Sequence, residues 1–123
     1  MFQIDALSRK PVYEQIVEQT ERFVLSGILK PGDQLPSVRS LSVQLSINPN
    51  TIQKAYAELE RRGITVSAAG RGCFVRSRVD DAVRQFQSRK LDELSRLLDE
   101  LRSSGLSREE LNRFIDAQYE KGG

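Results

Sequence analysis

The sequence predicts a mainly α-helical fold with one small β-hairpin. Two short helical patterns lie on either side of a break in residues 37–61, and two β-rich runs joined by a glycine-rich turn follow in residues 64–75. A longer leucine-rich helical pattern then begins near residue 79. This order predicts a winged helix-turn-helix followed by a two-helix C-terminal dimerisation tail. We therefore expect two domains, residues 1–78 and residues 79–123.

The first helix is expected to begin near Pro11, because proline suits a first helical position, and to end at Gly27. Apolar and small side chains recur along it at three- and four-residue spacings. Its predicted inward face consists of Ile16, Val17, Thr20, Phe23 and Val24. A turn at residues 31–33 and a very short strand at residues 34–36 are expected to follow.

The second and third helices have clear start signals. Ser37 is a good N-cap for a helix that runs to Leu45, and Asn48 followed by Pro49 combines an N-cap with a proline at the first helical position. Gly63 is expected to end the third helix. The spacing of four apolar residues predicts its inward stripe, which is Ile52, Ala55, Tyr56 and Leu59.

Residues 64–66 and 73–75 are β-rich runs, and the glycines of residues 70–72 predict the turn that joins them into a hairpin. The tail is predicted to form one long helix, a break at residues 103–105 and a last helix that starts with a capping box at residues 107–110. Its leucine-rich stripe is either the core of a monomer or the seam of a symmetric dimer. We favour the dimer, because little else in the chain is left to cover two helices. The seam residues are Val83, Phe86, Leu94, Leu97, Leu98 and Leu101, with Leu111, Phe114 and Ile115 folding back on them.

Composition excludes several functional classes. The 123 residues include no histidine and one cysteine, so we expect no metal site, no internal disulfide, no cofactor and no enzymatic activity. The sequence shows neither a signal peptide nor an apolar run that could span a bilayer, and we expect a cytoplasmic protein without membrane contact.

Charge is distributed unevenly. Residues 1–78 carry 11 Lys/Arg and 7 Asp/Glu, whereas residues 79–123 carry 8 and 10. No acidic residue occurs between Asp33 and Glu58, or between Glu60 and Asp80. Two acid-free windows in the basic half of the chain favour a polyanionic partner, and with a helix-turn-helix that partner is double-stranded DNA.

Candidate DNA-binding residues lie on the outward side of the third helix. Asn50, Thr51, Gln53 and Lys54 are polar or basic, as contact with base edges and phosphates requires, although an ordinary helical hairpin would also present a solvated polar face. Arg39, in the first turn of the second helix, and Arg71, at the hairpin tip, are further candidates. Cys73 is interpreted as a small, half-buried strand residue rather than a redox sensor.

The chain resembles the GntR family of bacterial transcription regulators, in particular its short YtrA-like branch. The resemblance covers residues 10–76 and rests on P-V-Y-E-Q-I at 11–16, G-I-L-K-P-G-D-Q-L-P-S-V-R-S-L at 27–41, N-P-N-T-I-Q-K-A-Y-A-E-L-E at 48–60, R-G-I at 62–64 and G-R-G-C-F-V at 70–75. It implies a winged helix-turn-helix that binds an operator as a dimer. It also implies a set of DNA contacts: Ser37, Arg39, Asn50, Thr51, Gln53, Lys54, Gly70 and Arg71.

These patterns and the resemblance together predict a sequence-specific transcriptional regulator that binds a palindromic operator as a homodimer, and the resemblance implies that it is a repressor. The alternative is a winged-helix protein-interaction module that does not bind specific DNA and docks through its leucine-rich tail. The sequence does not indicate which effector, if any, controls the protein.

Overall fold

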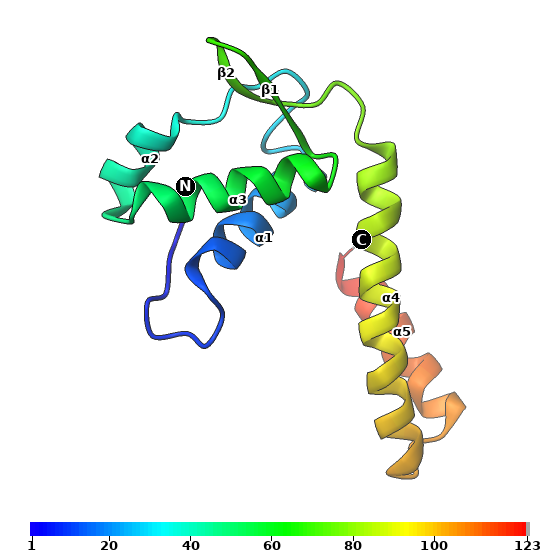
Figure 1. Cartoon of the computed structure of the whole chain (residues 1–123). Helices are drawn as coiled ribbons and strands as arrows, with labels where there is room; N and C mark the ends of the chain where they lie inside the picture. The colour runs from blue at the N-terminus through cyan, green and yellow to red at the C-terminus, as the bar shows by residue number, and fades with distance from the viewer. Residues whose placement is uncertain (123) are drawn as a thin grey trace. The chain divides into compact units, whose positions relative to one another are not determined.

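The computed structural model describes residues 1–122. Their elements in chain order are α1 (Val12–Leu25), α2 (Val38–Leu45), α3 (Pro49–Arg61), β1 (Thr65–Ala68), β2 (Gly72–Val75), α4 (Asp80–Ser103) and α5 (Arg108–Gly122) (Figure 1). The order confirms the predicted mainly helical fold, with a hairpin wing after the helix-turn-helix and helices after the wing. The chain groups into two compact units, Met1–Gln85 and a second that begins at Phe86. The predicted domain division after residue 78 stays a prediction.

Helix α1 begins one residue later than Pro11, which is its N-cap rather than its first helical residue. The predicted inward face is buried at Ile16, Val17, Thr20 and Val24. Phe23 is half-buried: it packs against the hydrophobic core and also edge-on against Phe2, with ring centroids 5.9 Å apart. The segment that precedes α1 therefore covers one side of this helix.

The caps predicted for α2 and α3 are confirmed. The Ser37 hydroxyl accepts a hydrogen bond from the Ser40 amide at 3.0 Å, and the Asn48 side chain accepts one from the Asn50 amide at 2.8 Å. Between the two helices Ser46 adopts a left-handed backbone with a φ of 55°. This conformation turns the chain sharply after α2, so that α3 starts in a new direction.

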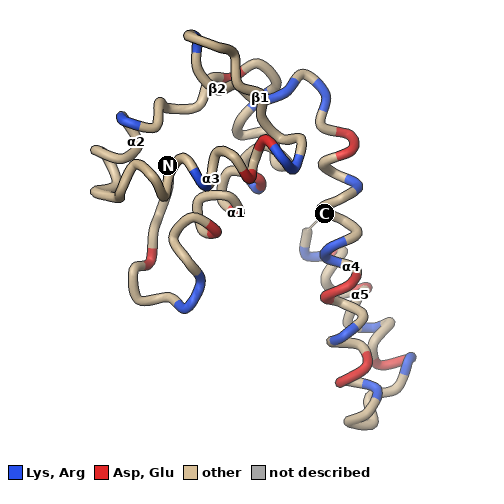
Figure 2. Tube along the Cα trace, in the orientation of Figure 1, with Lys and Arg blue, Asp and Glu red and all other residues tan. Residues whose placement is uncertain are grey.

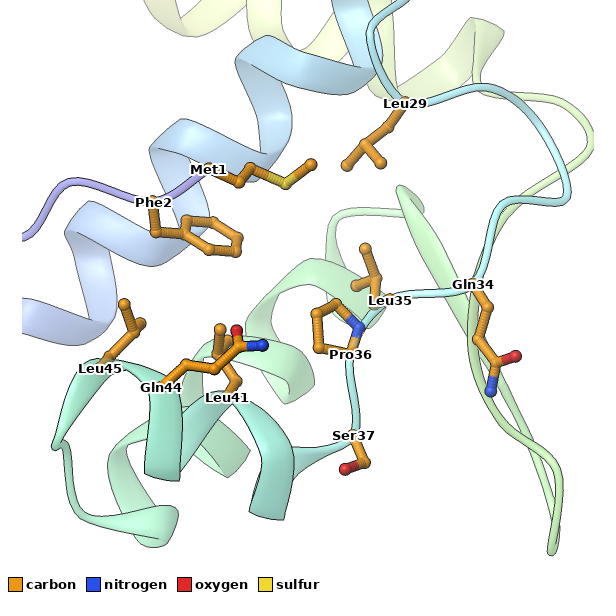
Figure 3. A pocket seen from close by; sticks show the side chains of 10 residues that line it. All are labelled: Met1, Phe2, Leu29, Gln34, Leu35, Pro36, Ser37, Leu41, Gln44 and Leu45. Carbon is orange, nitrogen blue, oxygen red and sulfur yellow. The ribbon is translucent and has the colours of Figure 1, made fainter.

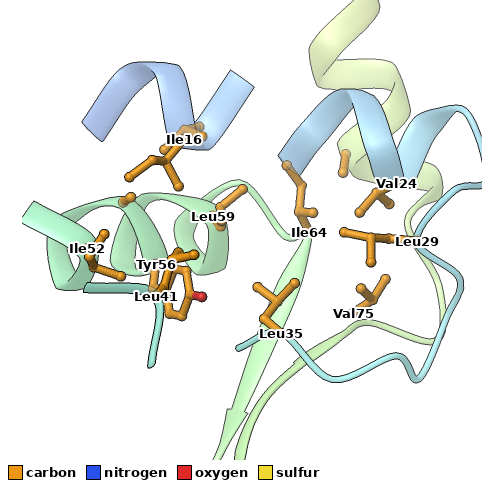
Figure 4. Packing of buried hydrophobic residues seen from close by; sticks show 13 residues of the cluster. Ile16, Val24, Leu29, Leu35, Leu41, Ile52, Tyr56, Leu59, Ile64 and Val75 are labelled. Carbon is orange, nitrogen blue, oxygen red and sulfur yellow. The ribbon is translucent and has the colours of Figure 1, made fainter. Parts of the chain in front are cut away.

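The hydrophobic core lies among α1, α2, α3 and the base of the hairpin (Figure 4). All four residues of the predicted α3 stripe, Ile52, Ala55, Tyr56 and Leu59, are buried in it. Tyr56 also donates a hydrogen bond from its hydroxyl to the Pro36 carbonyl at 2.7 Å. The inward face of α3 is thus committed to packing, and its outward face is left for contacts with a partner.

The hairpin is antiparallel, with Thr65 opposite Val75 and Ala68 opposite Gly72. The chain before α2 runs along the outer edge of β2, where Leu35 donates its amide hydrogen to the Cys73 carbonyl at 2.9 Å. The strand predicted at residues 34–36 is reduced to a single bridge between Gln34 and Phe74. Pro36 cannot continue it, since proline has no amide hydrogen to donate to a ladder.

The tail helices have the predicted capping box. The Ser107 amide donates to the Glu110 carboxylate at 3.2 Å, and the Glu110 amide donates to the Ser107 hydroxyl at 3.1 Å. Within residues 1–122, α5 has no buried residue, and no helix combines the length and apolarity needed to cross a lipid bilayer. These two helices therefore hold their apolar side chains largely in solvent when the chain is alone.

An ion-pair cluster at the end of α3 makes stability depend on acid pH. Hydrogen bonds from Arg61 and also from Arg62 hold the pKa of the Glu58 carboxyl at about 2, below its ordinary value of 4.5. Since the folded-state pKa is the lower one, the stabilisation is complete above pH 4.5 and is lost as the pH falls toward 2. At pH 6, Glu58→Gln is expected to lower the free energy of unfolding by about 1 kcal/mol relative to the wild-type chain. At pH 3, this difference between the variant and the wild-type chain should be smaller.

Urea unfolding at the two pH values measures this effect. Glu93→Gln is the matched control, because Glu93 forms an exposed pair with Lys90 on α4. If the free energy of unfolding fell equally with pH in the wild-type chain and in Glu58→Gln, the role assigned to Glu58 in acid-dependent stability would be contradicted.

Candidate nucleic-acid interface

The N-termini of α2 and α3 create a surface that attracts anions. Neither helix has an acidic residue in its first turn, and amide hydrogens at a helix N-terminus carry a partial positive charge. Arg39 lies exposed in the first turn of α2. Figure 2 shows basic residues at the start of α2 and at the hairpin tip, whereas acidic residues occur toward the end of α3.

One groove of this surface lies between α3 and the hairpin. It has a volume of about 460 Å³, and three of the predicted contact residues line it: Ser37 from the start of α2, Gln53 from α3 and Gly70 from the hairpin tip. Gln53 is exposed. The structure thus brings together three residues that are separated in the sequence, with Gln53 on the side of α3 that faces the hairpin.

A second hollow lies on the other side of α3, against the start of α1. Asn50, Thr51 and Lys54 line it together with Tyr13. The Lys54 ammonium lies 4.0 Å from the centroid of the Tyr13 ring, a cation–π contact that holds this side chain close to α1. Tyr13 belongs to the P-V-Y-E-Q-I segment, but no sequence pattern predicts its contact with Lys54, because the two residues lie far apart in the chain.

The hairpin tip presents one exposed arginine. Arg71 donates its amide hydrogen to the Ala68 carbonyl at 2.9 Å, which closes the turn. The φ angles of Gly70 and Gly72 are 71° and 116°, a left-handed region that favours glycine. Arg71 is therefore carried at the point of the wing, between two residues without side chains.

Acidic groups near the interface are already engaged. The Glu60 carboxylate accepts a hydrogen bond from the Ser67 amide at 3.2 Å, and Glu58 is paired with Arg61 and Arg62. Cys73 is half-buried on β2, and burial raises the pKa of its thiol. The arrangement can bind a polyanion through helix N-termini, polar side chains and separate arginines.

Comparison with known proteins agrees with this geometry. A helix-turn-helix with a polar outward face on its second helix and a basic wing defines a winged-helix DNA-binding protein. The model of the bacterial regulatory proteins of the gntR family matches residues 12–75. The chain belongs to the GntR family and is a DNA-binding transcriptional regulator.

Two relatives resemble the chain over almost its whole length, and a third resembles part of it. The HTH-type transcriptional repressor YtrA of Bacillus subtilis (strain 168) is 40% identical over 116 residues, which is 94% of this chain and 89% of the relative. A transcriptional regulator from Oenococcus oeni, known from a crystal structure, is 36% identical and superposes with a TM-score of 0.79. The match covers 96% of this chain and 99% of the Oenococcus oeni chain. The DNA-binding domain of AraR, solved in complex with operator ORX1, is 31% identical and superposes with a TM-score of 0.53. The match covers 61% of this chain and 92% of the AraR chain.

Proposed function

We propose that the protein is a cytoplasmic repressor that binds a palindromic operator as a homodimer, with residues 1–78 on DNA and residues 79–123 forming the dimer. The observation that carries the proposal is the uncovered apolar stripe of α4. Leu94, Leu97 and Leu101 are 44%, 54% and 40% exposed in the single chain, whereas Val83, Phe86 and Leu98 are half-buried. Such a stripe on a charged helix is best covered by a second copy of itself.

The last helix adds to the same apolar surface. Leu101 of α4 and Leu111 and Phe114 of α5 line a hollow of about 560 Å³ where the two helices meet. Phe114 and Ile115 are 60% and 40% exposed in the single chain. In the proposed dimer these side chains close over the α4 seam, so that the buried apolar area comes from both tail helices.

On the operator, α3 enters the major groove. Asn50 and Gln53 read base edges, since amide side chains match the donor and acceptor pattern of adenine. Thr51, Lys54 and Ser37 contact the sugar–phosphate backbone of the DNA or the base edges next to those that Asn50 and Gln53 read. Lys54 leaves the Tyr13 ring to do so, at a small cost, because an exposed cation–π contact is worth about 0.5–1 kcal/mol. Arg39 clamps a phosphate, and Gly70 lets the wing carry Arg71 close to the minor groove.

Repression follows from occupancy of a promoter site by two winged domains. The resemblance to YtrA, which is named as a repressor, supports this sign of regulation. The test is to recover and sequence the genomic DNA that the protein binds, and then to measure transcription from those promoters with and without the protein. Promoters without inverted repeats, or higher transcription in the presence of the protein, would overturn the proposal.

The two arginines are expected to make separate cationic contacts with the DNA. Arg39→Ala and Arg71→Ala should each reduce the slope of log affinity against log salt by about 1, because each loss leaves one fewer counterion to be released. Fluorescence anisotropy with labelled operator over a salt series measures the slope. Arg108→Ala on α5 is the control for a lost surface charge. An unchanged slope in both variants would contradict the placement, and binding that is independent of salt in the wild-type chain would favour the protein-interaction alternative.

A further inference from the structure

Gln34 touches the wing although it lies outside the hairpin. Its side-chain amide nitrogen, Nε2, donates a hydrogen bond to the Arg71 carbonyl at 3.0 Å. A Cβ atom at Gly72 would lie only 2.6 Å from the same nitrogen, so the amide occupies the space that a side chain would fill. Figure 3 shows the Gln34 side chain extending alongside the hairpin, whereas Met1, Phe2 and Leu45 face the hollow beside α2.

The backbone that carries Gln34 is firmly anchored. Gly32 donates its amide hydrogen to the Val75 carbonyl at 2.9 Å, and Val75 donates its own to the Asp33 carbonyl at 2.8 Å. Leu35, the next residue, is 3% exposed and belongs to the core. Gln34 therefore reaches the wing from a segment that the core and the edge of β2 hold in place.

The wing tip itself has little other support. Each strand of the hairpin has four residues, and the backbone bonds that tie residues 32–35 to β2 lie at residues 73–75, before the tip is reached. Gly70 and Arg71 are exposed. A hydrogen bond from outside the hairpin to the tip backbone is thus well placed to limit its motion.

We propose that Gln34 is a positioning residue that braces the wing, so that Arg71 is held ready for DNA. The inference rests on the proposed role of Arg71 as a DNA contact. Gln34 stands three residues before Ser37, the N-cap of α2, and so joins the wing to the helix that bears Arg39. Bracing lowers the conformational entropy that is lost when the wing is ordered on DNA.

The experiment combines Gln34→Met with Arg71→Ala. Methionine has about the length of glutamine but cannot donate the hydrogen bond. With a duplex that the wild-type chain selects from a random-sequence DNA library, Gln34→Met should weaken binding by about 2- to 10-fold, the range of a single lost hydrogen bond. In the Arg71→Ala background the same substitution should have almost no further effect, because the side chain that Gln34 positions is absent.

Controls separate bracing from a general loss of structure. Gln44→Ala changes another glutamine that lines the hollow beside α2, and it should leave affinity unchanged. In the free protein, NMR order parameters of residues 70–72 should fall in Gln34→Met and stay at wild-type values in Gln44→Ala.

Full additivity of Gln34→Met and Arg71→Ala, or unchanged order parameters at the tip, would overturn the inference while leaving DNA binding intact. Failure of the wild-type chain to select any duplex would instead overturn the proposed function, and the role of Gln34 in DNA binding with it.

Discussion

Replacing both Leu94 and Leu97 by aspartate is expected to make the protein monomeric and to weaken operator binding by about 100-fold or more, because linking two half-site contacts raises avidity by about that factor. Both leucines are largely exposed in the single chain, so the substitutions should leave each protomer folded. In the proposed dimer, however, four carboxylates would be placed in an apolar seam, where burying an unpaired charge is costly. Light scattering and operator titration measure the two effects.

Ser88→Asp combined with Ser95→Asp is the matched control. Both serines are exposed on α4 outside the leucine stripe, and the pair adds the same charge to the same helix. This variant should remain dimeric and bind normally. A wild-type chain that stays monomeric at tens of micromolar (roughly, for an interface of standard strength) would refute the dimer and the symmetric operator with it.

A truncated chain gives an independent measure of the tail. The cut belongs after Gln85 rather than after Arg78, because Ala82 is buried in the core of the first unit. This fragment should fold, remain monomeric and keep weak non-specific binding, since its phosphate contacts are intact. It should lose most operator affinity, because it recognises one half-site.

Gln53→Ala is expected to weaken binding to the preferred operator by about 1–3 kcal/mol and to relax specificity at one base pair of each half-site. Gln53 is exposed and lines the groove between α3 and the wing, so its amide can reach a base edge while the buried face of α3 is undisturbed. Lys54→Ala should instead weaken all sequences similarly, because a phosphate contact carries no base information.

Binding to a set of operators with single base-pair changes distinguishes these outcomes. Gln87→Ala, an exposed glutamine on α4, is the control for loss of an amide side chain. An unchanged ranking of operators in Gln53→Ala, with the fold intact by circular dichroism, would remove Gln53 from the set of base-reading residues.

The sequence by itself determined the local features of this protein. Ser37, Asn48 and Ser107 were predicted as N-caps, and each makes the expected hydrogen bond. The stripe of α3 was predicted from spacing alone and is buried. Such features depend on residues within one or two helical turns of each other. Hydrophobic periodicity and capping chemistry also involve residues at that separation, so both can be recognised in the sequence.

The tertiary structure decided what depends on distant residues. It placed Lys54 over Tyr13, joined Gln34 to the Arg71 carbonyl and distributed the predicted DNA contacts over two sides of α3. It also showed that Phe23 packs against Phe2 as well as against the core and that Ala82, at the start of the tail, packs with the core of the winged domain. No periodicity or cap reports these contacts, because each arises only when separate elements pack together and bring distant side chains within a few ångströms.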